Sequence, residues 1–115
     1  PYTLTKEAIE NWVASYEYYT PNAPTPKKKL NPEFTIEEGQ QEAYLQFLLY
    51  ARRYETLFTG LRWFDIKRYG IEIYRRTMQS GKPVTIGDML KVRDNRCALQ
   101  IPTDVISAGI TPNPR

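Results

Sequence analysis

The sequence predicts a mainly α-helical fold with little or no β structure, and three observations support this. Apolar residues recur at the spacing of an amphipathic helix in two stretches, residues 9–19 and 44–61. Thr35 and Glu38 form a Thr-x-x-Glu motif before the second stretch, and this motif is typical of a helix N-terminus. A proline-rich stretch, residues 20–34, separates the two and excludes regular structure between them.

Composition limits the classes of function. The chain has 115 residues, of which 41% are apolar and 13% aromatic, which suits one small domain or part of a larger one. Its net charge is only +3, so nucleic acid is not an expected partner. With a single cysteine, Cys97, and no histidine, an internal disulfide and a Ser–His or Cys–His catalytic pair are excluded. We expect no metal, no cofactor and no enzymatic activity.

The first helix is expected to begin at Thr3 or Thr5, with Glu7 favourably placed in its first turn. One interpretation of its apolar stripe is a face turned toward the core, and the other is an aromatic platform for a carbohydrate. Tyr18 lies off the stripe and is a candidate ligand-binding residue. The stripe consists of Ile9, Trp12, Val13, Tyr16 and Tyr19.

The proline-rich loop, residues 20–34, contains three consecutive lysines, residues 27–29. These lysines suggest either a basic patch for an acidic ligand or a lipid head group, or an ordinary solvated loop. Lys28, at their centre, is the second candidate ligand-binding residue.

The second helix is expected to run from Thr35 to about Thr59, with Gly39 and Gly60 near its limits. Leu45 and Leu49 add a second apolar flank, so we expect this helix to lie centrally between its neighbours. Its main apolar face comprises Tyr44, Phe47, Leu48, Ala51, Tyr54, Phe58 and Leu61.

Several short elements should follow. A helix over residues 61–69 would end in a bend at Gly70, and a second short helix would cover residues 71–78. Residues 79–83 should form a turn, whereas residues 85–90 fit no single class. Beyond a turn at Asp94 and Asn95 we expect an extended stretch, residues 97–101. A helical turn capped by Thr103 and ended by Gly109 should precede an irregular tail.

Residues 52–70 combine large apolar side chains with closely spaced charges of both signs. The pairs Arg52 and Glu55, Arg62 and Asp65, and Asp65 and Arg68 are each three residues apart, which brings opposite charges together on a helix. One interpretation is a site for an anionic ligand. The other is a buried ion-pair network that fixes how two helical segments cross at Gly60.

Acid/base catalysis by two carboxylates would need the surroundings of the two groups to differ, so that one pKa is raised and the other is not. Glu55 and Asp65 are the candidates by composition, but each lies three residues from an arginine that would keep it ionised. We therefore name no catalytic residue.

The same stretch resembles a known family. The sequences Arg-Arg-Tyr-Glu at residues 52–55 and Gly-Leu-Arg-Trp-Phe-Asp-Ile-Lys-Arg-Tyr-Gly at residues 60–70 resemble the C-terminal signature of SusD/RagB nutrient-binding outer-membrane lipoproteins. Residues 99–102 and 108–114 also agree, so the likeness spans roughly residues 45–115. Ala51, Thr59 and the Asn-Pro-Arg ending depart from the pattern. The signature residues are Arg53, Glu55, Gly60, Arg62, Trp63, Phe64, Asp65 and Arg68.

The resemblance implies a role and a location. Residues 1–115 would be the C-terminal segment of a SusD-like helical fold built from tetratricopeptide-type helices and irregular loops. The protein would capture a glycan or another nutrient at the cell-surface face of the outer membrane. A lipid anchor outside this chain would hold it there, and it would deliver the ligand to a SusC-like TonB-dependent transporter. Its partners would also include the remainder of its own fold.

Two other classes of function remain open on the sequence. A small helical protein–protein interaction module without ligand binding is the main alternative. An enzyme acting on glycans would require acidic residues supplied from outside this chain.

Overall fold

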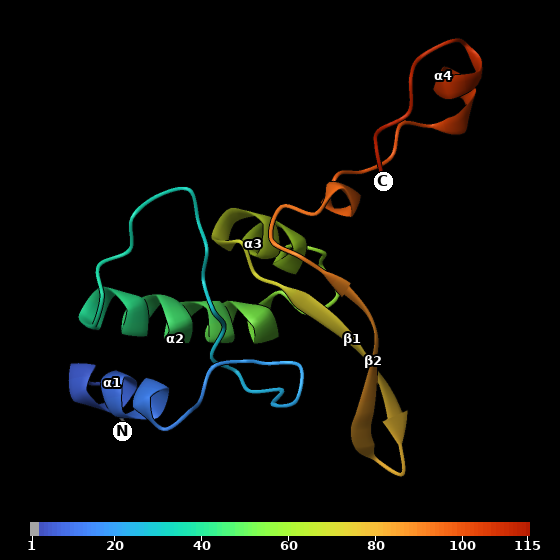
Figure 1. Ribbon diagram of the computed structural model, residues 1–115. Coiled ribbons are helices and arrows are strands. Elements are labelled where there is room, and N and C mark those ends of the chain that lie inside the picture. The colour runs from blue at the N-terminus through green and yellow to red at the C-terminus, as the bar shows by residue number, and fades with distance from the viewer. Residues whose placement is uncertain (1–2) are drawn as a thin grey trace.

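The computed structural model describes residues 3–115, apart from the side chains of residues 83–85. Over these residues the fold is mixed α/β, because a two-stranded antiparallel sheet accompanies four α-helices (Figure 1). The prediction of a mainly α, tetratricopeptide-type fold with little or no β structure is therefore wrong. In order, the elements are α1 (Lys6–Ala14), α2 (Gln40–Glu55), α3 (Arg62–Tyr69), β1 (Ile73–Gln79), β2 (Lys82–Leu90), the 3-10 turn η1 (Asn95–Cys97) and α4 (Thr103–Ser107).

Helix α1 begins as predicted but is shorter than its apolar stripe. The Thr5 hydroxyl accepts a hydrogen bond from the Ala8 N–H at 3.2 Å, which confirms Thr5 as the N-cap. The helix ends at Ala14, where the hydroxyl and N–H of Ser15 both donate to the Trp12 carbonyl. The last two rings of the predicted stripe, Tyr16 and Tyr19, therefore lie beyond the helix.

Helix α2 starts later and ends earlier than expected. The predicted cap at Thr35 is wrong, because the N-cap is Gly39, at φ 91°, and no side chain caps the helix. Instead, the Gln41 side chain reaches back from the first turn and accepts the Glu37 N–H. At the other end the helix stops at Glu55.

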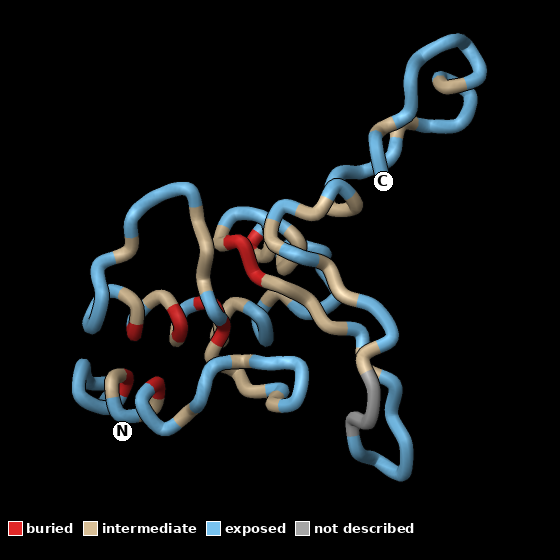
Figure 2. The backbone as a smooth tube through the Cα atoms, viewed as in Figure 1, coloured by how far each residue is buried: buried red, intermediate tan, exposed pale blue. Residues whose placement is uncertain are grey.

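Helices α1 and α2 pack side by side and form the apolar core. Ile9 and Val13 of α1 are buried, as are Ala43 and Leu49 of α2, and Figure 2 shows these buried segments on the facing sides of the two helices. The Trp12 ring lies between them, with its centroid 5.6 Å from that of Phe47 and 4.7 Å from that of Tyr50. Several residues of the apolar face predicted for α2 are exposed instead, namely Tyr44, Leu48, Tyr54, Phe58 and Leu61.

The buried side of α2 is centred on a polar residue, Gln46. The apolar spacing therefore predicted the wrong face of this helix as the buried one. Gln46 is only 2% exposed, and its side chain accepts the Lys28 N–H at 2.9 Å and donates to the Lys28 carbonyl. Both backbone groups of the loop residue are thereby satisfied inside the protein. The proline-rich loop, residues 20–34, has no regular secondary structure, as predicted, but it packs on α2 through this contact.

Helix α3 matches its prediction, and the proline-rich loop contacts its C-terminal end. Gly70 is the left-handed C-cap, at φ 57° and ψ 50°, and a side chain there would collide with the Asn31 carbonyl. Asn31 donates its N–H to the Tyr69 carbonyl at 2.8 Å and its side-chain amide to the Gly70 carbonyl at 3.1 Å. These bonds join the loop to the end of α3.

Strands β1 and β2 form a hairpin where a short helix was predicted over residues 71–78. Ile73 pairs with Leu90 and Gln79 with Lys82, with two register shifts between them. The turn predicted at residues 79–83 is present but shorter: it consists of Ser80 and Gly81, and both have positive φ, as type I′ two-residue hairpin turns require. Ile73, Tyr74 and Thr77 are residue types with a high strand propensity, and pairing with β2 stabilises the strand.

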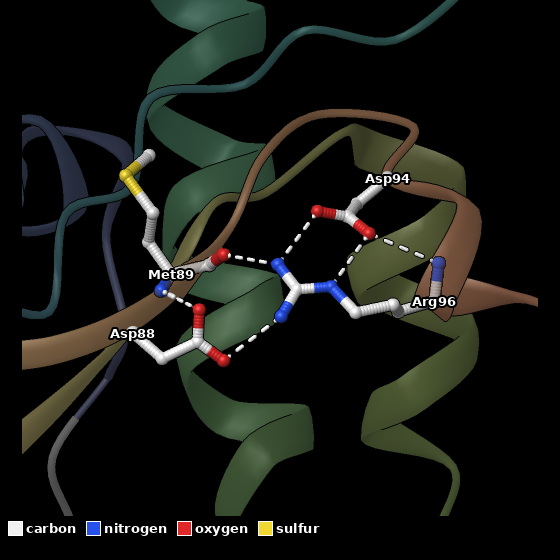
Figure 3. Close-up of polar contacts among 4 residues, drawn as sticks. All are labelled: Asp88, Met89, Asp94 and Arg96. Carbon is white, nitrogen blue, oxygen red and sulfur yellow. Dashed lines mark hydrogen bonds and ion pairs between the residues drawn. The ribbon is translucent and has the colours of Figure 1, made fainter. Parts of the chain in front are cut away.

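The chain after β2 is held by one arginine (Figure 3). The Arg96 guanidinium donates to the Asp88 carboxylate at 2.8 Å and to the Met89 carbonyl at 2.6 Å. It also donates to both Asp94 oxygens at 2.9 Å, and these bonds hold the pKa of Asp94 well below its usual range. Asp94 caps η1, so the turn predicted at residues 94–95 is displaced to Val92 and Arg93.

The C-terminal segment, residues 98–115, extends away from the helices and the hairpin, with α4 at its far end (Figure 1). It closes on itself, since the Asn113 side chain donates to the Leu99 carbonyl at 2.8 Å. Cys97 belongs to η1 instead of the predicted extended stretch, and Thr103 is the first residue of α4 instead of its cap.

Candidate functional site

A cavity of about 680 Å³ opens between the proline-rich loop, the start of α2 and strand β1. Its volume is within the ~300–1,000 Å³ typical of small-molecule sites. Three tyrosine rings and three glutamate carboxylates line it together with smaller groups. The lining residues are Tyr18, Tyr19, Thr20, Pro21, Lys29, Leu30, Ile36, Glu38, Glu42, Glu72 and Tyr74.

Contacts between the loop and the hairpin hold two of the rings in place. Tyr19 and Tyr74 stack with their centroids 5.3 Å apart and their planes 25° apart. Arg76 of β1 donates to the Tyr19 hydroxyl at 2.6 Å and to the Pro21 carbonyl at 2.9 Å, and also to the Thr20 carbonyl. These contacts hold the part of the cavity wall that Tyr19, Pro21 and Tyr74 form.

Two of the carboxylates accept hydrogen bonds from phenols. Tyr18 donates to Glu42, and this bond raises the pKa of Tyr18 to about 12. Tyr74 donates to Glu72 at 2.6 Å, which likewise raises the pKa of Tyr74 to about 12. Both phenols are therefore neutral at pH 7, and each glutamate keeps an oxygen that can accept further hydrogen bonds.

The structure separates the two candidate ligand-binding residues. Tyr18 is 40% exposed and lines the cavity, and the Lys27 ammonium lies 4.4 Å from its ring centroid. Lys28 is 8% exposed, so it forms part of neither a surface patch nor a solvated loop. Its ammonium donates to the Thr25 carbonyl at 2.8 Å and lies 3.4 Å from the Tyr19 ring centroid.

The stretch that resembles the SusD/RagB signature is only partly buried. Asp65 of α3 is 5% exposed, accepts two hydrogen bonds from Arg52 of α2 and lies 4.0 Å from Arg62. Arg53, Glu55 and Arg68 are exposed, and within residues 3–115 no ion pair joins Glu55 or Arg68 to the others. Trp63 is half-buried and Phe64 is 65% exposed, while Gly60 has φ 80° in the connection between the helices.

Sequence reasoning missed most of the cavity. Tyr19 was assigned to a helix, Glu38 to a capping motif, and Glu42, Glu72 and Tyr74 to no site. The segment beside the loop and strand β1 are far apart in the sequence, since the bond between Tyr19 and Arg76 joins residues 57 positions apart. Local periodicity carries no signal for such a contact.

Comparisons with known proteins identify no relative of this chain. No family model matches the chain, and searches of curated proteins and of solved structures found no match either. Among the helices that the structure describes, none is long and apolar enough to cross a membrane. No cluster of three or more histidine, cysteine, aspartate or glutamate residues suited to a metal ion occurs in the described part of the chain.

Proposed function

We propose that this chain is part of a SusD-like, non-enzymatic glycan-binding protein of the cell surface, and that the tyrosine-lined cavity holds the sugar. The observation that carries the proposal is that three rings, Tyr18, Tyr19 and Tyr74, line the cavity beside the acceptors Glu42 and Glu72. Sugar rings stack on aromatic faces, and their hydroxyls donate to carboxylates. The resemblance of residues 52–70 to the SusD/RagB signature supports the same class.

The resemblance also suggests how the bound sugar would be used. A SusD-like protein anchored at the outer membrane delivers its ligand to a SusC-like TonB-dependent transporter. Affinity would come from stacking and scattered hydrogen bonds, without a covalent step. The proposal concerns binding and delivery, and it does not depend on a tetratricopeptide-type fold.

Binding of neutral polysaccharides to the chain tests the proposal. A panel of α-glucan, β-glucan, xylan and mannan would be screened by affinity electrophoresis, followed by titration calorimetry with oligosaccharides. We expect Tyr18→Ala to weaken binding about tenfold, because losing one stacking contact costs roughly 1.4 kcal/mol. Tyr44→Ala is the matched control, since Tyr44 is similarly exposed but lies outside the cavity. Equal loss in both variants, or hydrolysis of any polysaccharide, would count against the proposal.

A protein-interaction module without ligand binding is the second candidate. Large apolar side chains are exposed around the connection from α2 to α3, and such exposure is typical of surfaces that contact another polypeptide. Failure of every polysaccharide to bind, together with self-association in light scattering that Phe58→Asp abolishes, would favour this candidate. The exposed residues are Tyr54, Leu57, Phe58, Leu61 and Phe64.

A further inference from the structure

A second, smaller cavity carries an excess of positive charge. Its volume is about 170 Å³, and it lies between the proline-rich loop, the two helices α2 and α3, and the start of β1. Lys28 of the loop, Arg53 of α2 and Arg62 of α3 line it. Three isoleucines complete its wall, namely Ile66, Ile71 and Ile73. Cations from three separate elements therefore converge on one small, partly apolar space.

The nearest acids leave part of this charge unmatched. The Arg62 Nη1 atom is buried and has no hydrogen-bond partner, because the Asp65 carboxylate is 4.0 Å away and is shared with Arg52. A buried guanidinium nitrogen without an acceptor is costly. The described ammonium contacts of Lys28 are a carbonyl and a tyrosine ring, and neither carries a formal charge.

One carboxylate, Glu72, also lines the cavity. Its Oε2 atom accepts the hydrogen bond from Tyr74, and no ion pair from Glu72 to the three cations is present among the described residues. With three cations and one carboxylate, the cavity has a net positive charge. Consistent with this, the pKa of Lys28 is lowered to about 7. Burial is the larger cause, and the charges of Arg53 and Arg62 add to it.

We propose that this cavity binds a small oxyanion, with Arg62 and Arg53 donating hydrogen bonds and Lys28 acting as a point charge. A planar guanidinium fork and a compact ammonium together suit a carboxylate, sulfate or phosphate. The cavity is smaller than the ~300 Å³ lower range of drug-sized sites, so it fits a single anionic group.

The oxyanion can come from two sources. It can be a free ion, or it can be the acidic group of a sugar held in the larger cavity. Tyr19 and Glu72 line both cavities, which places the two side by side. The sugar-borne source rests on the proposed glycan-binding function, whereas binding of a free oxyanion does not.

Thermal unfolding and calorimetric titration at constant ionic strength and pH 7 distinguish the sources. The probes are inorganic phosphate, glucuronate and glucose. Each charged probe replaces an amount of chloride that carries the same charge. We expect phosphate to stabilise the chain, and glucuronate to bind more tightly than phosphate if a sugar carries the anion. Glucose is uncharged and reports on the larger cavity alone. If phosphate binds and glucose does not, the glycan proposal is overturned and the oxyanion proposal stands.

Two variants test whether the oxyanion binds in this cavity. Arg53→Gln removes an exposed cation from the cavity without leaving a buried charge, and we expect about tenfold weaker phosphate binding. Arg68→Gln is the matched control, because it removes an exposed arginine outside this cavity. No binding of phosphate or glucuronate by the unmodified chain would overturn the proposal. An equal effect of the two variants would also overturn it, because binding would then depend only on net charge.

Discussion

Arg52 and Asp65 connect helix α2 to helix α3 through two hydrogen bonds from one guanidinium. The Arg52 Nη2 atom lies 3.1 Å from Asp65 Oδ1, and its Nε atom lies 3.3 Å from Oδ2. Asp65 is 5% exposed, and it also provides the nearest negative charge to Arg62. This pair makes Asp65 the anchor of the connection between the two helices.

Asp65→Ala should therefore destabilise the protein more than any other change in the signature. Removing the carboxylate leaves Arg62 half-buried and unpaired, and breaking such a pair costs roughly 3–5 kcal/mol. Chemical denaturation of the two proteins measures the difference. The control is Glu55→Ala, an exposed signature acid, which should change the free energy of unfolding by less than about 0.5 kcal/mol. Weaker ligand binding at unchanged stability in Asp65→Ala would refute the structural role.

The sequence predicted those parts of the molecule that depend on local signals. The cap at Thr5, the irregular proline-rich loop, helix α3 with Gly70 and the turn near Gly81 were all expected. Each depends on side-chain chemistry or backbone freedom within a few residues. The ion pair of Arg62 with Asp65 was also predicted from its spacing.

The parts that were missed depend on distant contacts. A strand at β1 exists because β2 pairs with it, and a buried glutamine in α2 makes sense only with the Lys28 backbone beside it. Helical spacing over residues 44–61 therefore predicted the wrong buried face. The tyrosine-lined cavity was missed for the same reason, since Tyr19 and Tyr74 meet only after the hairpin docks on the loop.

Gln46→Ala should loosen the proline-rich loop. The substitution leaves the N–H and carbonyl of Lys28 without partners, and each buried unsatisfied group costs roughly 1–3 kcal/mol. We expect a lower unfolding midpoint and faster amide exchange across residues 25–31. Gln40→Ala, which removes an exposed amide in the same helix, should leave both quantities unchanged. Slow exchange retained in Gln46→Ala would show that other contacts hold the loop.

Phe58→Asn should stabilise the chain. Phe58 has φ 63° and is 98% exposed, so a bulky ring occupies a left-handed backbone position and packs against nothing in the described chain. That conformation costs an ordinary residue roughly 1–2 kcal/mol, and asparagine tolerates it better. A higher denaturation midpoint is the expected result. Leu57→Asn, at an exposed neighbour without positive φ, should give no such gain, and equal gains would assign the effect to reduced surface hydrophobicity.

Lys28 should make the protein more stable as the pH rises above 7. Its pKa is lowered to about 7 from an ordinary value of 10.5, first by burial and then by the charges of Arg53, Arg62 and Arg76. Between these two values the unfolded chain binds more protons than the folded one, so the free energy of unfolding increases with pH. Below pH 7 the lysine is protonated in both states and adds no slope.

Denaturant titrations between about pH 6.5 and pH 9.5 measure this slope below the range in which tyrosines titrate. Tyr18 and Tyr74, whose pKa values are raised to about 12, contribute a slope of opposite sign only above about pH 10. Lys28→Met should flatten the increase, whereas Lys29→Met, at an exposed neighbour, should preserve it. A phosphate-free buffer is required, because an oxyanion in the adjoining cavity would favour the charged lysine. An identical slope in Lys28→Met and the unmodified chain would mean that Lys28 keeps an ordinary pKa in the folded protein.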